Sequence, residues 1–277
     1  MFHGHCGRAL FLSALMILLT VAAQPVKALV YGLDIYAGNG TMNWPLIAGA
    51  GRQFCEAKAT EGVSYEDDQL SNNETNATAN GVLIGAYDFC HPEDNTPSAE
   101  ANYFYNYAKQ YGAFNSSKFI PMLDLEDGAG DTIDGASNLA TWAVDWCQDV
   151  KNLTGVTPAI YCNQSYADDD LGGDSAISNY PLWIAAYNVT PDLTGSPWSS
   201  YTFLQYSSHD VIQGDPAAYA DADEYGGSLA SLVSNYAIGG VAPAGMIVPE
   251  PGSVTVLIGV GITGLLRRRG RRSSALA

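Results

Sequence analysis

Basic residues are scarce in this chain and leave its central part strongly acidic. Residues 29–249 hold five Lys or Arg against 28 Asp or Glu, which gives a net charge of −23, and the full 277 residues carry −17. Because such a surface repels phosphate groups, the composition argues against a nucleic-acid-binding protein. We expect a soluble, self-repelling domain whose carboxylates are mostly solvated.

Cysteine and histidine are also few. No two of the five cysteines are spaced as CxxC, and beyond residue 28 the only histidines are His91 and His209. This scarcity argues against a zinc site, and we expect neither a metal nor another cofactor. Four cysteines follow residue 28, and an even number in an exported protein suggests disulfides. We favour a Cys147–Cys162 bridge, because the two residues flank the end of a predicted helix and the next strand, while the other connectivities stay open.

Apolar runs of membrane-spanning length are missing as well, since a spanning helix needs about 20 residues. The run 9–23 follows Arg8 and ends in small residues. That pattern is typical of a cleaved secretory signal, which we expect over residues 1–28. A second run, 253–266, would reach only about 21 Å as a helix, short of a bilayer core of about 30 Å. It lies between the Pro-Glu-Pro motif at 249–251 and five arginines.

This arrangement over residues 248–272 resembles the PEP-CTERM sorting signal of Gram-negative bacteria, which an exosortase-type enzyme processes. The resemblance implies an exported protein in the periplasm, on the outer surface or in the extracellular matrix. Residues 226–247 are rich in Gly, Ala and Ser and uncharged, so we expect a linker there. The remaining residues, 29–225, show no internal repeat and suffice for a single domain with one core.

Residues 29–225 alternate short apolar runs, which predict buried strands, with amphipathic helical patterns. In one of these helices Thr96 can cap the start, Pro97 suits the first turn and Gly112 suits the exit. Repeated strand–helix units predict a parallel sheet, and about eight strands suggest a barrel whose last strands lack covering helices. The expected strands are 29–35, 52–60, 82–89, 119–125, 157–161, 182–187 and 202–206.

In such barrels the chemistry lies at the carboxyl ends of the strands, where this sequence gathers carboxylates and tyrosines. Asp124 and Glu126 are the sharpest signal, because residues two apart on a strand share a face, about 6.5–7 Å apart along the chain. With Asp34 and Asp221 at neighbouring strand ends, these groups cannot all ionise without repulsion, so at least one pKa should rise. A glycosidase needs such a carboxylic acid, still protonated near neutral pH, to protonate a leaving oxygen.

The same residues resemble a known family. The segments 58–62 (Lys-Ala-Thr-Glu-Gly) and 123–126 (Leu-Asp-Leu-Glu), followed by 181–185 (Pro-Leu-Trp-Ile-Ala) and 203–206 (Phe-Leu-Gln-Tyr), are similar to glycoside hydrolase family 25. Its members are Chalaropsis-type lysozymes, or N-acetylmuramidases. The resemblance runs in order from about residue 30 to 225. It implies an α/β fold, a flattened TIM-like barrel with five β/α units followed by three β-strands.

The resemblance also implies roles for the site residues. Glu126 would be the general acid/base, and Asp124 would stabilise the substrate's 2-acetamido group as it attacks the anomeric carbon, or act as the nucleophile. Asp34 and Asp221 match the flanking acidic positions of the catalytic centre. The expected sugar-binding residues are Lys58, Glu61, Tyr87, Phe89, Tyr161, Trp183, Tyr187 and Gln205.

Three positions depart from the family's usual pattern. Glu56 stands where an apolar residue is usual and shares a strand face with Lys58, so we predict a buried ion pair between them inside the barrel. Asp88 replaces a common histidine, and Ala186 replaces a usual polar residue. These departures bear on substrate preference and turnover rather than on the fold.

Together these features predict a secreted, monomeric glycoside hydrolase. It would cleave the β-1,4 bond between N-acetylmuramic acid and N-acetylglucosamine in peptidoglycan. Two alternatives remain, a glycosidase on another N-acetyl sugar polymer and a non-catalytic glycan-binding matrix protein that keeps the barrel. The chitinase signature DxxDxDxE is absent before Asp124, which disfavours chitin, and the four intact acidic residues disfavour the non-catalytic alternative.

Overall fold

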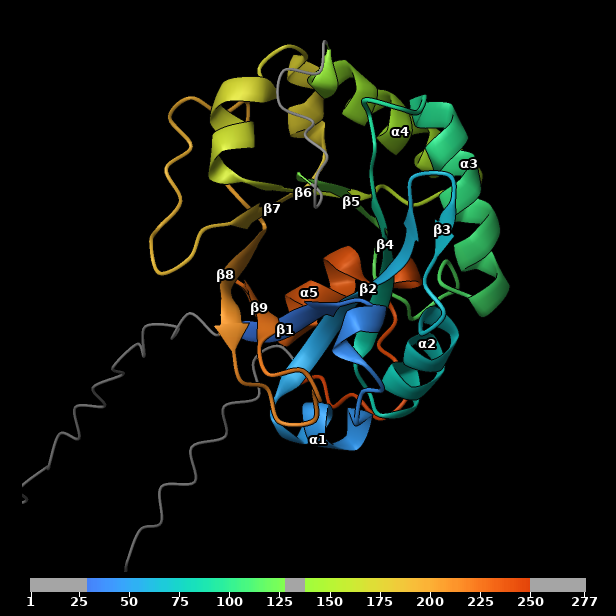
Figure 1. The fold of residues 1–277 in the computed structure, drawn as a ribbon. Helices are drawn as coiled ribbons and strands as arrows, with labels where there is room; N and C mark the ends of the chain where they lie inside the picture. The colour runs from blue at the N-terminus through green and yellow to red at the C-terminus, as the bar shows by residue number, and fades with distance from the viewer. Residues whose placement is uncertain (1–28, 128–137, 250–277) are drawn as a thin grey trace, which may run out of the picture.

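This computed structural model describes residues 29–127 and 138–249 (Figure 1). They contain nine strands and five α-helices. The expected signal over 1–28 and nearly all of the expected sorting segment lie outside them. The strands are β1 (Val30–Ile35), β2 (Arg52–Glu61), β3 (Tyr65–Glu66), β4 (Leu83–Phe89), β5 (Met122–Leu125), β6 (Ala159–Asn163), β7 (Leu182–Ala185), β8 (Phe203–Asp210) and β9 (Ala220–Tyr225). The helices are α1 (Trp44–Gly49), α2 (Leu70–Ala79), α3 (Pro97–Ala108), α4 (Leu139–Thr154) and α5 (Leu229–Tyr236), with short helical turns η1 (Ala37–Asn39), η2 (Lys109–Tyr111), η3 (Tyr166–Asp170), η4 (Ser175–Asn179) and η5 (Ile238–Gly240).

Within the described residues, every strand except β3 belongs to one closed barrel. Going round it, the order is β1, β2, β4, β5, β6, β7, β8 and β9, and β9 returns to β1. Neighbours from β1 to β8 are parallel, whereas β9 is antiparallel to both β8 and β1. The first five barrel strands are each followed by a helix or helical turn, and β7 and β8 are not. The predicted flattened TIM-like α/β barrel, five β/α units followed by three strands, is confirmed.

Buried apolar side chains form two clusters, one on each face of the sheet. The alternation along β2 shows the division, because Phe54 points into the barrel whereas Cys55 and Ala57 point toward the surrounding helices. Outside, α1 to α4 surround the ring of strands (Figure 1). Inside, aromatic rings fill one end of the barrel, and Trp183 stacks on Phe203 with ring centroids 4.7 Å apart.

The prediction of a linker over residues 226–247 was wrong for the central part of that segment. Residues 229–236 form α5, whose first turn is capped by the side chain of Ser228. Leu229, Leu232 and Val233 are buried in the cluster inside the barrel, and α5 is seen through the ring of strands in Figure 1. The apolar i, i+3, i+4 spacing makes this segment a plug for one end of the barrel, although its Gly-, Ala- and Ser-rich surroundings suggested a flexible chain.

The capping signals on α3 are confirmed, but the disulfide is not. Thr96 accepts a hydrogen bond from the backbone of Ala99, Pro97 begins the helix, and Gly112 takes a left-handed conformation after η2. The favoured Cys147–Cys162 bridge does not form, because each sulfur packs separately as a small apolar group in the outer cluster. The cysteines of the described part of the chain, Cys55, Cys90, Cys147 and Cys162, are all buried and free.

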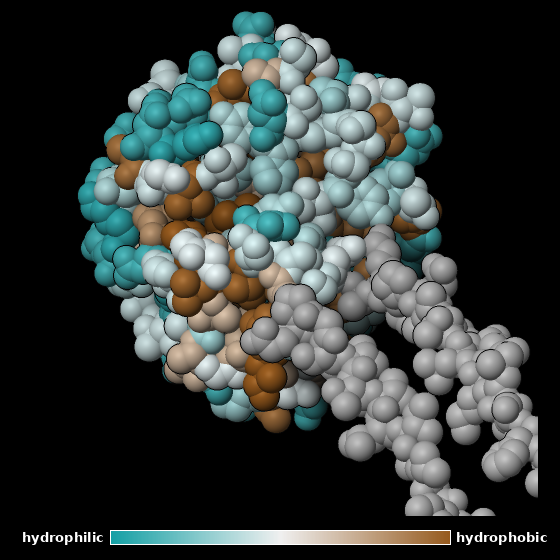
Figure 2. Space-filling view, turned by 180° about the vertical axis from the view of Figure 1, so that it is seen from behind, coloured by the Kyte–Doolittle hydropathy of each residue, from teal (hydrophilic) through white to brown (hydrophobic). Residues whose placement is uncertain are grey.

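The surface of the described residues is mixed rather than uniformly polar. Seen from behind, hydrophilic residues gather along the upper left flank, while apolar residues occur in patches broken by polar ones (Figure 2). None of the helices in residues 29–127 and 138–249 has both the length and the apolar character needed to cross a bilayer.

Candidate active site

A cleft of about 230 Å³ opens at the end of the barrel where the parallel strands finish. Asp34 comes from β1, Asp124 and Glu126 from the end of β5, and Asp221 from β9, so the four predicted acidic residues meet in one place. This end lies opposite the aromatic cluster that α5 closes. The lining residues are Asp34, Tyr36, Lys58, Tyr87, Phe89, Met122, Asp124, Glu126, Tyr161, Tyr187, Gln205 and Asp221.

The alternation of β5 presents Asp124 and Glu126 to the same cleft. Leu123 and Leu125 pack outward against the helices, so the two acidic side chains point inward. Asp124 is only 6% exposed, whereas Glu126 is partly open to solvent. Burial raises the pKa of Asp124 well above its ordinary value, and the charge of Glu126 adds to this rise. Burial likewise raises the pKa of Glu126, with a further contribution from Asp221. The pair therefore holds its protons to higher pH than two solvated carboxyl groups would.

Asp34 and Asp221 face one another across the β1–β9 pairing. Burial raises the pKa of Asp34 well above the ordinary range, and the charges of Asp223 and Asp221 raise it further. Burial raises the pKa of Asp221 to about 6, with a contribution from Asp215. Each of the four acidic groups in the cleft therefore binds its proton more tightly than a solvated carboxyl group.

A chain of hydrogen bonds crosses the cleft from Asp34 to Glu126. Gln205 Nε2 donates to Asp34 Oδ2 at 2.7 Å, and the hydroxyls of Tyr161 and Tyr187 lie 3.0 Å and 2.7 Å from Gln205 Oε1. Tyr161 also hydrogen-bonds to Glu126, which favours the ionised form of that carboxyl group. We call these three side chains, Gln205, Tyr161 and Tyr187, the amide–tyrosine arm. It fixes the spacing between the two acidic ends of the cleft.

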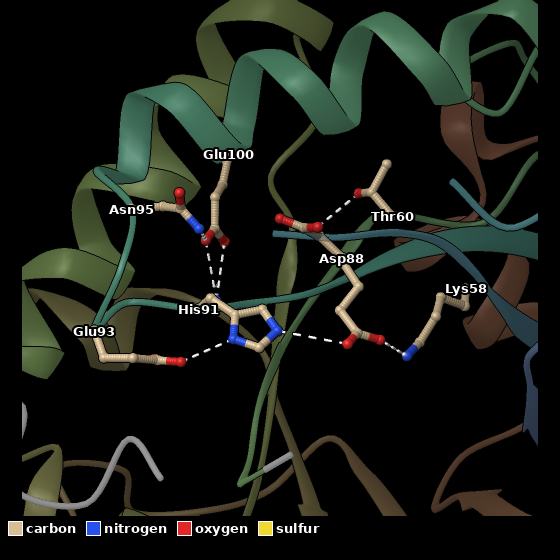
Figure 3. Close-up of polar contacts among 8 residues, drawn as sticks. Lys58, Thr60, Asp88, His91, Glu93, Asn95 and Glu100 are labelled. Carbon is tan, nitrogen blue, oxygen red and sulfur yellow. Dashed lines mark hydrogen bonds and ion pairs between the residues drawn. The ribbon is translucent and has the colours of Figure 1, made fainter. Parts of the chain in front are cut away.

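Among the described residues that line the cleft, Lys58 is the one with a cationic side chain. Its Nζ lies 2.7 Å from Glu61 Oε2 and 4.4 Å from the centre of the Phe89 ring. The ring of His91 continues the chain, with Nε2 3.5 Å from Glu61 Oε1 and Nδ1 2.8 Å from Glu93 (Figure 3). Burial alone would raise the pKa of Glu61, but its contacts with Lys58 and His91 lower it. Glu61 is thus an anion that holds the ammonium group in place.

The predicted Glu56–Lys58 ion pair was wrong. The two side chains do share the inner face of β2, but Lys58 extends toward the cleft and pairs with Glu61. Both oxygens of Glu56 are buried and have no hydrogen-bond partner among the described residues, and a Cβ atom on Gly85 would lie 2.6 Å from Oε1. Burial raises the pKa of Glu56 well above its ordinary value, with further contributions from Glu74 and Asp223. Glu56 is therefore a neutral carboxylic acid inside the barrel, in a space that Gly85 leaves open.

The other two departures from the family pattern do not line the cleft. Asp88 is buried behind the sheet, where Thr60 Oγ1 donates to Oδ1 at 2.6 Å (Figure 3). Trp146 Nε1 donates to Oδ2 at 3.0 Å. It therefore joins β4 to α4 instead of facing the cleft. Ala186 is also buried, and its backbone N–H donates to the carbonyl oxygen of Gln205.

Two predicted sugar-binding residues do not line the cleft, and two lining residues were missed. Trp183 is fully buried beneath it, and Glu61 stands behind Lys58. Tyr36 and Met122 do line the cleft, at the end of β1 and the start of β5. Tyr36 follows Asp34 by two residues, and this spacing could have revealed it. In the described ranges, no three His, Cys, Asp or Glu side chains are grouped so that they could hold a metal ion.

Comparison with known proteins assigns this barrel to a family. The family model "Glycosyl hydrolases family 25" matches residues 33–215. The chain belongs to this family. It is 31% identical over 211 residues to Lysozyme M1 of Streptomyces globisporus, covering 74% of this chain and 70% of that protein. It is also 32% identical over 208 residues to the N,O-diacetylmuramidase of Chalaropsis sp., covering 72% and 92%.

A solved structure agrees with this assignment to family 25. The bacterial lysozyme from Streptomyces coelicolor superposes with a TM-score of 0.68 at 28% identity, covering 76% of this chain and 98% of that one. The family, the relatives and the barrel together identify the chain as a glycoside hydrolase.

Proposed function

We propose that this family 25 chain is an exported lysozyme. It hydrolyses the β-1,4 bond between N-acetylmuramic acid and N-acetylglucosamine in peptidoglycan. The observation that carries the proposal is the meeting of Glu126 and Asp124 in one cleft with Asp34 and Asp221. Export through the N-terminal segment and exosortase sorting through the Pro-Glu-Pro segment belong to the same proposal, as does action as a monomer outside a Gram-negative cell.

Glu126 acts as the general acid. It is the more exposed member of the Asp124–Glu126 pair, so it can reach a glycosidic oxygen and regain its proton from water. Burial and the charge of Asp221 raise its pKa, which favours the protonated form that a general acid needs. After the bond breaks, the same carboxylate removes a proton from the incoming water.

Asp124 orients the reacting sugar. It lies deeper than Glu126, and its Oδ1 atom has no partner among the described residues, so it is free to accept the N–H of a 2-acetamido group. The acetamido oxygen then attacks the anomeric carbon, as in substrate-assisted glycosidases. Tyr36, Tyr87 and Phe89 offer aromatic faces to the sugar rings, and Lys58 offers a cation to the carboxylates of the substrate.

Cleavage of purified peptidoglycan tests the proposal directly. We expect residues 29–249 to release new reducing ends, and chemical reduction followed by hydrolysis should identify them as muramic acid. Chitin oligomers run in parallel test the alternative of another N-acetyl sugar polymer. Binding to peptidoglycan without release of reducing ends would instead support a non-catalytic glycan-binding protein and contradict the proposal.

Salt should speed this reaction. The net charge of −23 on residues 29–249 repels an anionic cell wall, and salt shortens the range of that repulsion from about 30 Å at 10 mM to about 8 Å at 150 mM. We expect the initial rate on intact walls to rise a few-fold across this range. A short uncharged glycan substrate serves as the control, and its rate should hardly change. A rate on intact walls that falls steadily with added salt would contradict the prediction.

A further inference from the structure

Asp223 lies inside the barrel, directly below the cleft, and does not line it. It follows Asp221 by two residues on β9, so both side chains point inward. In the register of β1 and β9, Asp221 pairs with Asp34. Asp223 pairs with Gly32, two residues away on each strand and farther from the cleft. Asp223 has 0% exposure, so neither substrate nor bulk water reaches it.

The two oxygens of Asp223 have different surroundings. Oδ1 accepts a hydrogen bond of 2.8 Å from Trp183 Nε1. Oδ2 is buried, and no N–H or O–H of the described residues donates to it. The side chain of Asp34 projects to the same inner face from the adjacent strand β1, and a hydrogen-bonding contact with it lowers the pKa of Asp223 against the effect of burial. Because an ionised carboxylate can only accept, this contact becomes a hydrogen bond only when one of the two groups carries a proton.

We propose that Asp223 is a positioning residue that shares one proton with Asp34, so that the two carboxyl groups carry a single negative charge. Asp34 is anchored from both sides in this arrangement. The shared proton holds it from below, and Gln205 Nε2 holds its Oδ2 atom at 2.7 Å from the side. Asp223 thereby sets where the amide–tyrosine arm begins, although it never touches substrate.

The charged and titratable groups around Asp223 favour this single-proton state. Asp34 approaches from β1, Asp221 from β9, and Glu56 and Arg52 from β2, while the thiol of Cys55 lies on the outer face of β2. Arg52 is the one cation in this set, and it is already paired with Asp210 at 2.8 Å. Burial raises the pKa of Asp223 to about 8. The charge of Asp221 adds to this rise, and the hydrogen bond from Trp183 opposes it.

Loss of the shared proton would disturb the far side of the cleft. Asp34 and Asp223 would then be two adjacent buried anions, which repel one another strongly where water is excluded. Asp34 is linked through Gln205 and Tyr161 to Glu126, so its displacement would misplace the acid that the proposed function requires. The inference therefore rests on that proposed function for its effect on catalysis, but not for the proton itself.

Asp223→Asn tests the shared proton in the folded protein. An Asn side chain can still donate to Asp34 and accept from Trp183, yet it cannot ionise. We expect kcat/KM within about threefold of wild type near pH 6, and a less steep fall of activity above about pH 8. Asp223→Leu removes the donor, and we expect kcat to fall at least about tenfold at every pH while KM changes little. Glu224→Gln, the next residue on β9 and partly exposed, is the matched control and should behave as wild type.

Two measurements without substrate separate this inference from the proposed function. The infrared band of a buried protonated carboxylic acid should weaken in Asp223→Asn and persist in Glu224→Gln. Thermal unfolding should show Asp223→Asn gaining stability relative to wild type as the pH rises, because the folded pKa of Asp223 is raised. If no variant cleaves peptidoglycan, these results still decide on the proton. An unchanged band together with parallel stability profiles, or full kcat in Asp223→Leu, would overturn the inference.

Discussion

Glu126→Gln is expected to lower the release of reducing ends by roughly 10²–10⁴-fold, because an amide cannot donate a proton to the leaving oxygen. The pKa of Glu126 is raised by burial and by Asp221, which favours the protonated carboxyl group in the substrate-free cleft. Gln has nearly the same shape and can keep the hydrogen-bonding contact with the Tyr161 hydroxyl. Substrate binding should therefore persist, with the loss in kcat rather than in KM.

The measurement is the initial rate on purified peptidoglycan, together with circular dichroism and an unfolding curve for each variant. Glu224→Gln makes the same chemical change on β9, outside the cleft, and should retain the wild-type rate. Asp124→Asn should also be slow, but it keeps the acid and should therefore keep the alkaline fall in its residual activity. A Glu126→Gln protein that folds and keeps more than about one tenth of the wild-type rate would remove Glu126 from the role of acid.

Residue patterns predicted the barrel and most of its cleft because both depend on alternation along strands. Asp124 and Glu126 lie between Leu123 and Leu125, and only one face of a strand can point outward against helices. The rule that parallel strands finish at a common rim then brings Asp34 and Asp221 to the same place. These inferences need only the side of the sheet on which each residue lies.

The wrong predictions concerned how deep a side chain lies in the barrel and how far it extends. The alternation of residues along a strand gives neither. Trp183 lies on the correct inner face, yet it is fully buried below the cleft, with its indole N–H on Asp223. Lys58 shares the inner face with Glu56, but its long side chain carries the ammonium group upward to Glu61. For α5, eight residues with a short apolar stripe were hidden in a segment of linker-like composition. The segment becomes a helix because its apolar stripe packs against the open end of the barrel, and the sequence alone does not reveal that contact.

Glu56→Gln is expected to stabilise the protein, by an amount that grows with pH. Glu56 is buried, and neither of its oxygens has a partner in the part of the chain that the structure describes. Burial raises its folded-state pKa well above the value of about 4.3 that we take for the unfolded chain. Between these two pKa values the folded state binds more protons than the unfolded state. The free energy of unfolding therefore falls by about 1.4 kcal/mol for each pH unit through this group. Gln cannot ionise, so the variant escapes this loss.

Urea unfolding from about pH 4 to about pH 9 measures the difference. Near pH 4 Glu56 is largely protonated in both states, and the two proteins should be about equally stable. Glu66→Gln removes an exposed carboxylate from the neighbouring strand β3, and its curve should run parallel to that of wild type. If the Glu56→Gln curve also ran parallel, Glu56 would be ionised and compensated in the folded state. Because Lys58 is held by Glu61 and a Cβ on Gly85 would collide with Glu56, a neutral acid is the state that fits this space.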